Sequence, residues 1–378
     1  MRKYLFGLSL ALTAVPVLAQ INGNGYYRAK NYTTERYITV VDNKSEGVDV
    51  ATTTADLGAM CTIRSWDRIE SNPASVLYLE YISGDQYNVK SQGCDAHAIM
   101  GFYLRLAQLN GYPSIYKAYQ TKSGTTAYLS DEIGDWDEAL LNTNEKRAQN
   151  WVITPVDANT DNYFGIKPTV VADGKNYASF YASFPFKYAA DGMKAMYITL
   201  VDGKHGAALY KDYTEDIIPA ATPIIIECPS TEPSGNKVDL LPDTKAAPTD
   251  NKLIGVYFNW DYSRYHTNQV VYDANTMRVL GTCADGRLGF VKAANLSTIP
   301  ANTHYIMVDE GSEDEIKIMT QEEYDEILAA GISEMTTDNP AHQAVYTING
   351  VKIANNATEA SRLPRGIYII GNKKVVIK

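Results

Sequence analysis

The sequence lacks the short motifs that mark common enzyme classes. It contains no G-x-S-x-G nucleophile elbow, H-E-x-x-H zinc motif, phosphate-binding loop or dinucleotide-binding fingerprint. Histidine is scarce, with 5 residues scattered along the chain, and no second pair completes the C-x-x-H spacing of Cys94 and His97 into a zinc site. The sequence therefore indicates no catalytic apparatus, no metal and no cofactor.

Long apolar runs are also missing, apart from one at the start of the chain. Residues 4–18 carry no charge, follow Arg2 and Lys3, and lead to Ala19, which leaves Gln20 as the expected new N-terminus. This run is shorter than the roughly 20 apolar residues that cross a bilayer. We therefore predict a signal peptide over residues 1–19, a secreted or cell-surface protein, and no transmembrane segment.

Basic residues are fewer than acidic ones. The chain has 34 Lys and Arg against 44 Asp and Glu, a formal net charge of -10, and such a protein repels the phosphate backbone of nucleic acids. Tyrosine is the common aromatic residue, with 28 against 8 Phe and 4 Trp, and it favours half-buried strands. With short alternating segments between turn residues, this composition predicts an exported all-β protein that does not bind nucleic acid.

Cysteine is rare, and its spacing leaves two interpretations open. The four cysteines are Cys61, Cys94, Cys228 and Cys283. Disulfides Cys61–Cys94 and Cys228–Cys283 would each close within one proposed domain. The alternative is four buried thiols.

A short hairpin occurs three times near the N-terminus, over residues 27–40, 77–89 and 115–130. Each copy is a strand, a polar turn and a second strand centred on tyrosine, at Tyr37, Tyr87 and Tyr128. One hairpin cannot bury its apolar face alone, whereas three can close around a pseudo-threefold axis. We therefore predict a β-trefoil over residues 20–156.

Two segments of this region resemble ricin-type trefoil lectins. Residues 25–38 look like the start of that family, and Gln149-Asn150-Trp151 matches its Q-x-W signature. The resemblance implies that Trp151 fills the core of the trefoil and that the domain binds carbohydrate. The chain departs from the family in having one Q-x-W, with Ala148 beside it, and in residues 95–110, whose helical spacing predicts a helical insertion.

The candidate ligand-binding residues are Asp135, Trp136 and Asp137, in an acidic turn of the third hairpin copy. A sugar ring can stack on an aromatic face while carboxylates accept hydrogen bonds from its hydroxyl groups. The alternative is that Trp136 packs under the trefoil and the acidic residues form a solvated rim.

A second acidic loop has the oxygen spacing of a calcium site. It runs from Asp157 to Asp161, but Pro168 occupies the twelfth position, where a calcium loop carries a bidentate Glu. We interpret it as a polar turn between domains.

The rest of the chain is predicted to contain three further segments. Residues 168–310 indicate an antiparallel β-sandwich, 311–340 an acidic linker with a short helix at 321–328, and 341–378 a small β-meander. The sandwich resembles a module of exported Bacteroidetes proteins. The meander, with its Asn349-Gly350 turn and Leu363–Ile370 segment, resembles C-terminal tails related to type IX sorting domains, which implies an encounter with export machinery.

These observations favour a secreted or surface-associated, non-catalytic binding protein with a possible glycan ligand. Two alternatives stay open. A secreted glycoside hydrolase could hide its two carboxylates among the 44 acidic residues, and a structural surface or matrix component needs no ligand site.

Overall fold

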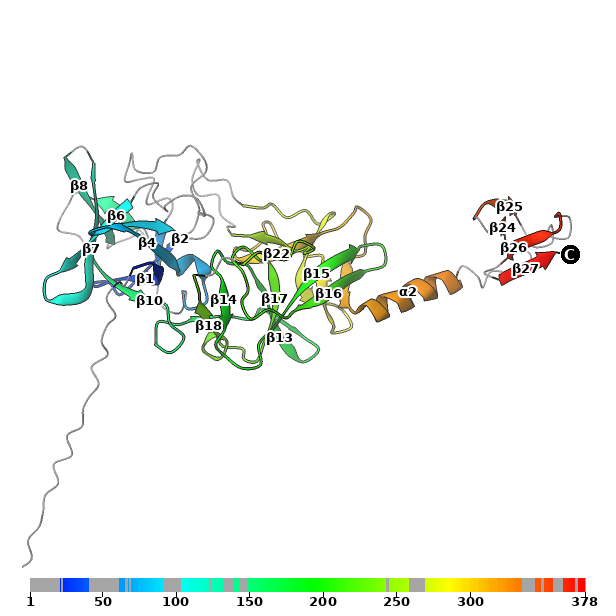
Figure 1. Ribbon diagram of the computed structural model, residues 1–378, viewed down its shortest axis with the longest axis horizontal. Coiled ribbons are helices and arrows are strands. Elements are labelled where there is room, and N and C mark those ends of the chain that lie inside the picture. Colours follow the sequence, from blue (N-terminus) through cyan, green and yellow to red (C-terminus); the bar gives the residue numbers. More distant parts are fainter. Residues whose placement is uncertain are drawn as a thin grey trace, which may run out of the picture.

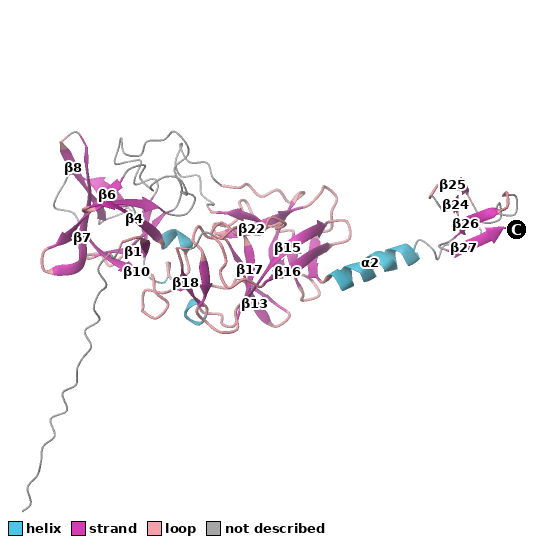
Figure 2. Cartoon of the chain, in the orientation of Figure 1, coloured by secondary structure: helices cyan, strands magenta, loops and turns pink. Residues whose placement is uncertain are grey.

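The structure is a computed structural model. It describes residues 21, 23–40, 61–64, 67, 69–90, 103–122, 124–131, 139–142, 149–242, 245–257, 269–334, 344–347, 350–355, 363–370 and 373–377. Strands dominate these residues, and their only α-helix is α2 (Gln321–Glu334), so the all-β prediction is confirmed (Figure 2). Within the same ranges no helix is long and apolar enough to cross a membrane. The predicted signal peptide, residues 1–19, lies outside them.

Six antiparallel strands close into a barrel in the N-terminal part of the chain (Figure 1). Each strand pairs with the next, and the last pairs with both its predecessor and the first, which closes the ring. In ring order the strands are β1 (Gly25–Asn31), β4 (Leu77–Ser83), β5 (Gln86–Lys90), β6 (Tyr103–Leu109), β7 (Tyr112–Lys122) and β10 (Asn150–Pro155).

Two hairpins accompany this ring, β2 (Tyr37–Val40) with β3 (Cys61–Arg64), and β8 (Thr125–Asp131) with β9 (Ala139–Asn142). The three predicted tyrosine hairpins are confirmed as the antiparallel pairs β1–β2, β4–β5 and β7–β8. The β-trefoil itself stays a prediction, because residues 41–60, 91–102 and 132–138 of this region lie outside the described ranges.

The predicted helical insertion at residues 95–110 is wrong for its second half. Residues 103–109 form strand β6, which pairs with β5 and β7 in the barrel wall. The hairpin with β7 turns at Gly111, whose φ of +83° suits glycine. Leu106 points into the barrel and is buried, while its neighbours Arg105 and Ala107 are partly exposed, as strand alternation requires.

The barrel core is centred on Trp151, which is fully buried. Its indole N–H donates a 2.9 Å hydrogen bond to the carbonyl of Leu129, so the one polar atom of the ring is satisfied. The surrounding core residues are Tyr27, Ala29, Ile38, Leu77, Leu79, Val89, Leu106, Tyr116, Ala118, Leu129 and Ile153.

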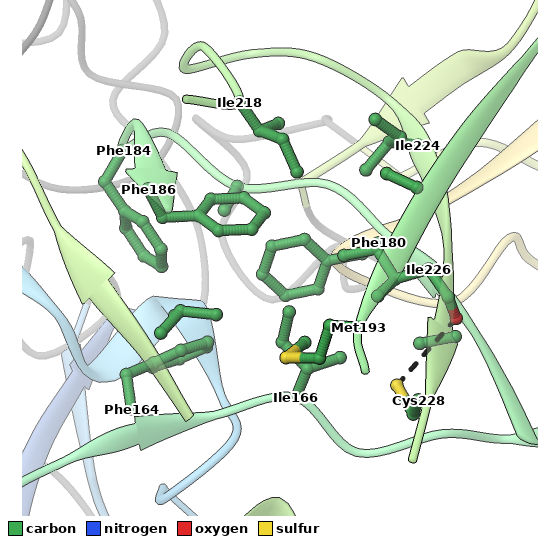
Figure 3. Packing of buried hydrophobic residues seen from close by; sticks show 14 of the residues in the cluster. Phe164, Ile166, Phe180, Phe184, Phe186, Met193, Ile218, Ile224, Ile226 and Cys228 are labelled. Atoms are coloured by element: carbon green, nitrogen blue, oxygen red, sulfur yellow. Dashed lines mark hydrogen bonds between the residues drawn. The ribbon is translucent and has the colours of Figure 1, made fainter. Parts of the chain in front are cut away.

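The middle module, residues 164–319, packs two sheets across an apolar core (Figure 3). The smaller sheet contains three strands, β11 (Phe164–Gly165), β14 (Phe186–Tyr188) and β18 (Lys237–Leu240). Phenylalanine rings from this sheet, such as Phe164 and Phe186, meet Phe180 and Ile224 from the larger one. A half-buried sheet face covered by another sheet is the arrangement of a β-sandwich.

The larger sheet has ten strands and curls so that its own inner face forms a second core. Its edge strand β12 contacts β20 near the other end, where Thr282 Oγ1 donates a 2.8 Å hydrogen bond to the carbonyl of Val171. In sheet order the strands are β12 (Val170–Ala172), β13 (Lys175–Phe180), β17 (Ile224–Cys228), β15 (Lys194–Asp202), β16 (Ala207–Tyr213), β23 (Glu315–Met319), β21 (Leu288–Val291), β20 (Met277–Thr282), β22 (Thr303–Met307) and β19 (Ile254–Val256).

The predicted linker at residues 311–340 is wrong where the structure describes it. Strand β23 lies inside the large sheet, parallel to β16 and antiparallel to β21, so the module extends past residue 310. Ile316 of this strand is fully buried, which its acidic surroundings in the sequence concealed. Helix α2 follows and is longer than the predicted 321–328; its Tyr324 and Ile327 pack on Leu209 of β16.

The C-terminal segment forms a separate four-stranded antiparallel sheet, beyond α2 in Figure 1. Its strands are β24 (Val345–Thr347), β25 (Lys352–Ala354), β26 (Gly366–Ile370) and β27 (Lys373–Ile377). The predicted β-structure is therefore confirmed, but the meander topology is wrong, because β26 pairs with β24 and not with β25. Its small core consists of Val345, Ala354 and Tyr368.

Candidate functional site

The three residues predicted to bind a ligand, Asp135, Trp136 and Asp137, lie outside the described residues. They follow strand β8, which ends at the fully buried Asp131. The Arg36 guanidinium donates to both oxygens of Asp131, with a 3.1 Å bond from Nε to Oδ2, so the base of the predicted turn is tied to the first hairpin copy. The glycan site at Trp136 stays a prediction.

The middle module contains a hollow that sequence reasoning missed. Its volume is about 640 Å³, and it opens on the curled face of the large sheet, next to the start of α2. Seven strands, which lie far apart in the sequence, contribute to its wall, so no local sequence motif indicates it. Register explains the gathering, because residues directly opposite on neighbouring strands share a face: Glu227 stands opposite both Tyr177 and Lys194, and Met196 stands opposite Asp212.

Tyrosine supplies much of the wall of this hollow. The four tyrosines are Tyr177, Tyr188, Tyr210 and Tyr213. Tyr213 Oη donates a 2.8 Å hydrogen bond to the carbonyl of Ile217, and burial raises the pKa of both Tyr177 and Tyr213. These side chains present apolar ring surface together with hydroxyl groups, a combination suited to a ligand that has both apolar and hydroxylated faces.

The hydroxyl of Tyr188 is the exception in this wall. Its oxygen is buried and has no hydrogen-bond partner among the described residues. Burial raises the pKa of this phenol, and the nearby Cys228 thiol adds to the shift. A buried hydroxyl without a partner costs about 1–3 kcal/mol relative to a satisfied one, and this unused hydrogen-bonding group lies just beneath the wall of the hollow.

Charged side chains of both signs line the hollow, and four of them form two ion pairs. Lys175 Nζ lies 3.0 Å from Glu227 Oε2, and this hydrogen bond raises the pKa of Lys175. Arg287 Nη2 lies 2.9 Å from Glu323 Oε1. The backbone N–H of Thr320 also donates to Glu323 and, together with Arg287, holds the pKa of that carboxyl below its usual range.

The two carboxylates described above, Glu227 and Glu323, are poorly suited to acid catalysis. A general acid for glycoside hydrolysis needs a carboxyl whose pKa is raised. The pKa of Glu323 is instead lowered, and Glu227 forms an ion pair with Lys175. Paired carboxylates of this kind act as fixed hydrogen-bond acceptors.

The considered Cys228–Cys283 disulfide is absent, and both cysteines are buried free thiols. Strands β13 and β12 lie between them. Cys228 of β17 pairs with Asn176 of β13, and Asn176 pairs with Val171 of β12. Val171 is in turn hydrogen-bonded to Thr282, the residue before Cys283. Strands lie about 4.8 Å apart, which places the two thiols beyond the roughly 7 Å Cα limit of a disulfide. Cys228 Sγ instead faces the carbonyl of Ile226, 3.8 Å away (Figure 3).

The other proposed disulfide is not tested by the described residues. Cys94 and the side chain of Cys61 both lie outside them.

The candidate calcium loop at Asp157 forms a turn whose oxygens are engaged within the protein. Asp157 Oδ1 accepts a 2.8 Å hydrogen bond from the backbone of Asn159, as an Asx turn does. Asn162 donates to the carbonyls of Thr154 and Pro155. The polar-turn interpretation agrees with these contacts, and the described residues hold no cluster of three potential metal ligands.

Comparison with known proteins gives no assignment. No family model matches the chain, and no curated protein is significantly similar to it.

Proposed function

We propose that this chain is a secreted or surface-associated, non-catalytic binding protein whose ligand is a carbohydrate. The observation that carries the proposal is the hollow of the middle module, with tyrosine rings, paired charges and the unsatisfied Tyr188 hydroxyl in one wall. Two predictions support it further: the signal peptide at residues 1–19 and the trefoil-like N-terminal domain with its Q-x-W sequence.

The chemistry of the hollow suits a sugar better than a highly charged ligand. Its wall carries four acidic and three basic residues, so neither sign dominates. Fixed carboxylates such as Glu227 can accept hydrogen bonds from sugar hydroxyls, and the Lys194 ammonium can donate them. Tyr210 offers ring surface to the apolar face of the sugar.

A glycan array with the mature chain, residues 20–378, tests this function. Binding should be weak, with a dissociation constant near 1 mM, about -4 kcal/mol, because a shallow site must order a flexible sugar. Calorimetry would then compare Asp212→Asn, at the mouth of the hollow, with Trp136→Ala, in the predicted trefoil site. Loss of binding in one variant alone identifies the domain that holds the sugar.

Two other results would replace the proposal. Release of reducing ends from a polysaccharide would show a hydrolase, and the hollow carboxylates would become the first candidates for its catalytic pair. No binding and no turnover across the panel would favour a structural surface or matrix component.

A further inference from the structure

The C-terminal sheet has two apolar faces, of which one is covered. Directly opposite residues share a face, and Val345, Tyr368 and Ile370 belong to the inner side with its small core. The outer side carries Tyr346, Ile367, Ile369 and Val376; Tyr346 is 38 % exposed, Ile367 40 % and Val376 58 %. An antiparallel sheet normally leaves a polar face to water, so this outer face is unusual.

Positive charge frames the outer apolar face. One row of paired residues crosses all four strands: Lys352 on β25, Tyr346 on β24, Ile369 on β26 and Lys374 on β27. The two lysines are exposed and stand on the two edge strands, with the apolar residues between them. Residues 344–378 contain six basic residues and one acidic residue, whereas the whole chain has a net charge of -10.

The size of this face decides between its possible occupants. Four strands about 4.8 Å apart, two of five residues and two of three, cover on the order of 250 Å². A stable protein interface buries roughly 800 Å² on each partner, so the face is too small to hold a second copy by itself. Pairing two copies through this face would also bring their positively charged lysines close together.

We infer that the outer face of the C-terminal sheet is a docking surface for an anionic lipid bilayer. Apolar side chains at the centre enter the boundary between head groups and acyl chains, and the flanking lysines meet lipid phosphates. A small surface suffices there, because apolar burial and electrostatic attraction add without the need for a shaped partner. The carbohydrate site of the middle module would then be held close to a membrane.

Co-sedimentation of the mature chain with vesicles tests this inference. Vesicles that contain phosphatidylglycerol should bind the protein at least tenfold more strongly than vesicles of phosphatidylcholine alone, and binding should weaken as salt rises. The double variant Lys352→Glu, Lys374→Glu should lose that tenfold preference. A matched double variant, Lys204→Glu with Lys252→Glu, makes the same charge change at exposed lysines of the middle module and should keep it.

The apolar contribution is tested separately with Ile367→Ser and Val376→Ser, which leave the charge unchanged. Each should reduce binding to anionic vesicles several-fold while the melting temperature of the protein stays the same. Equal binding to neutral and anionic vesicles, no binding to either, or an equal loss in the matched control would overturn the inference. A dimer in light scattering that Ile367→Ser dissolves would assign the face to self-association instead.

Discussion

Arg28 Nε donates a 3.0 Å hydrogen bond to Ser75 Oγ inside the protein. The guanidinium is fully buried and also donates to the carbonyl of Ile69 at 3.1 Å and to Asn162 Oδ1 at 3.3 Å. Burial of the charge lowers the pKa of Arg28 to about 9. One side chain of β1 therefore fastens the segment before β4 and the segment after β10 to the barrel.

Replacing Arg28 by methionine should lower the free energy of unfolding by roughly 3 kcal/mol, because several buried acceptors lose their donor at once. Urea unfolding measures the loss. Arg105→Met is the control: its ion pair with Asp85 is partly exposed, so that change should cost under about 1 kcal/mol. Similar losses in both variants would contradict the role given to Arg28.

Trp151→Ala should destabilise the barrel by about 3–5 kcal/mol, because it empties the centre of the core and leaves the carbonyl of Leu129 without its donor. Trp136→Ala should leave the melting temperature nearly unchanged if Trp136 forms part of an exposed sugar site. Thermal unfolding of the two variants separates the alternatives. If both variants lose the same stability, Trp136 belongs to the core and the predicted trefoil site is wrong.

The buried His304 should make the protein less stable in acid. Its Nε2 lies 3.1 Å from the carbonyl of Ile224, to which it donates, while Nδ1 is buried without a partner among the described residues. Burial lowers the pKa of this imidazole from 6.5 to about 3. The unfolded chain therefore binds the proton first, and stability that is full above pH 6.5 falls as the pH drops toward 3.

At pH 4.5 the buried, neutral His304 should lower the free energy of unfolding by roughly 2–3 kcal/mol relative to pH 7. Urea unfolding at several pH values measures it, and His304→Phe should flatten the curve because no proton can be taken up at that position. His205→Phe serves as the control, since His205 is exposed and beside Asp202. An unchanged pH dependence in His304→Phe would show that His304 does not cause the loss of stability in acid.

Tyr188→Phe isolates the unused hydroxyl of the hollow. Removal of a buried group without a partner should leave the melting temperature unchanged or raise it, whereas affinity for the sugar found on the array should fall about five- to tenfold, near 1 kcal/mol. Tyr213→Phe is the matched control, because it removes a hydroxyl bonded to the carbonyl of Ile217 and should lower the melting temperature. Unaltered affinity in Tyr188→Phe would remove this residue from the site.

The cysteines should react according to burial. Burial raises the pKa of Cys228 to about 12 and that of Cys283 to about 11, and the thiolate is the reactive form. A thiol reagent at pH 8 should leave both untouched in the folded protein and label both in urea. Non-reducing peptide mapping also tests Cys61–Cys94, which should add about 3–4 kcal/mol if it forms. A recovered Cys228–Cys283 bridge would contradict the free thiols.

Local sequence signals were reliable for the hairpins and unreliable where pairing is long-range. The tyrosine hairpins are visible because strand, turn and strand are adjacent, with glycines such as Gly84 and Gly124 at positive φ in the turns. Residues 103–109 satisfy helical and strand spacing equally well. Only the partners β5 and β7 decide between them, so the helical prediction failed.

The hollow could not be predicted for a related reason. Tyr177, Asp212 and Ile318 line it together, yet each belongs to a different strand and none is part of a motif. Their common face follows from a sheet order that joins β16 to β23, a parallel pair that no turn signals. Sequence reasoning proposed the conspicuous acidic turn around Trp136, which lies outside the described residues and stays a prediction. It had no signal for ordinary tyrosines that register brings together.

The position of β23 also governs when the middle module can fold during synthesis. This strand is inserted between β16 and β21, and its pairing of Ala208 with Ile318 spans most of the module. Until residue 319 has left the ribosome, both neighbouring strands keep an unpaired edge and the core around Phe290 stays uncovered. Such long-range pairing forms slowly, so the module keeps unpaired strand edges exposed until late in its synthesis. A chain truncated before β23 would therefore aggregate rather than fold.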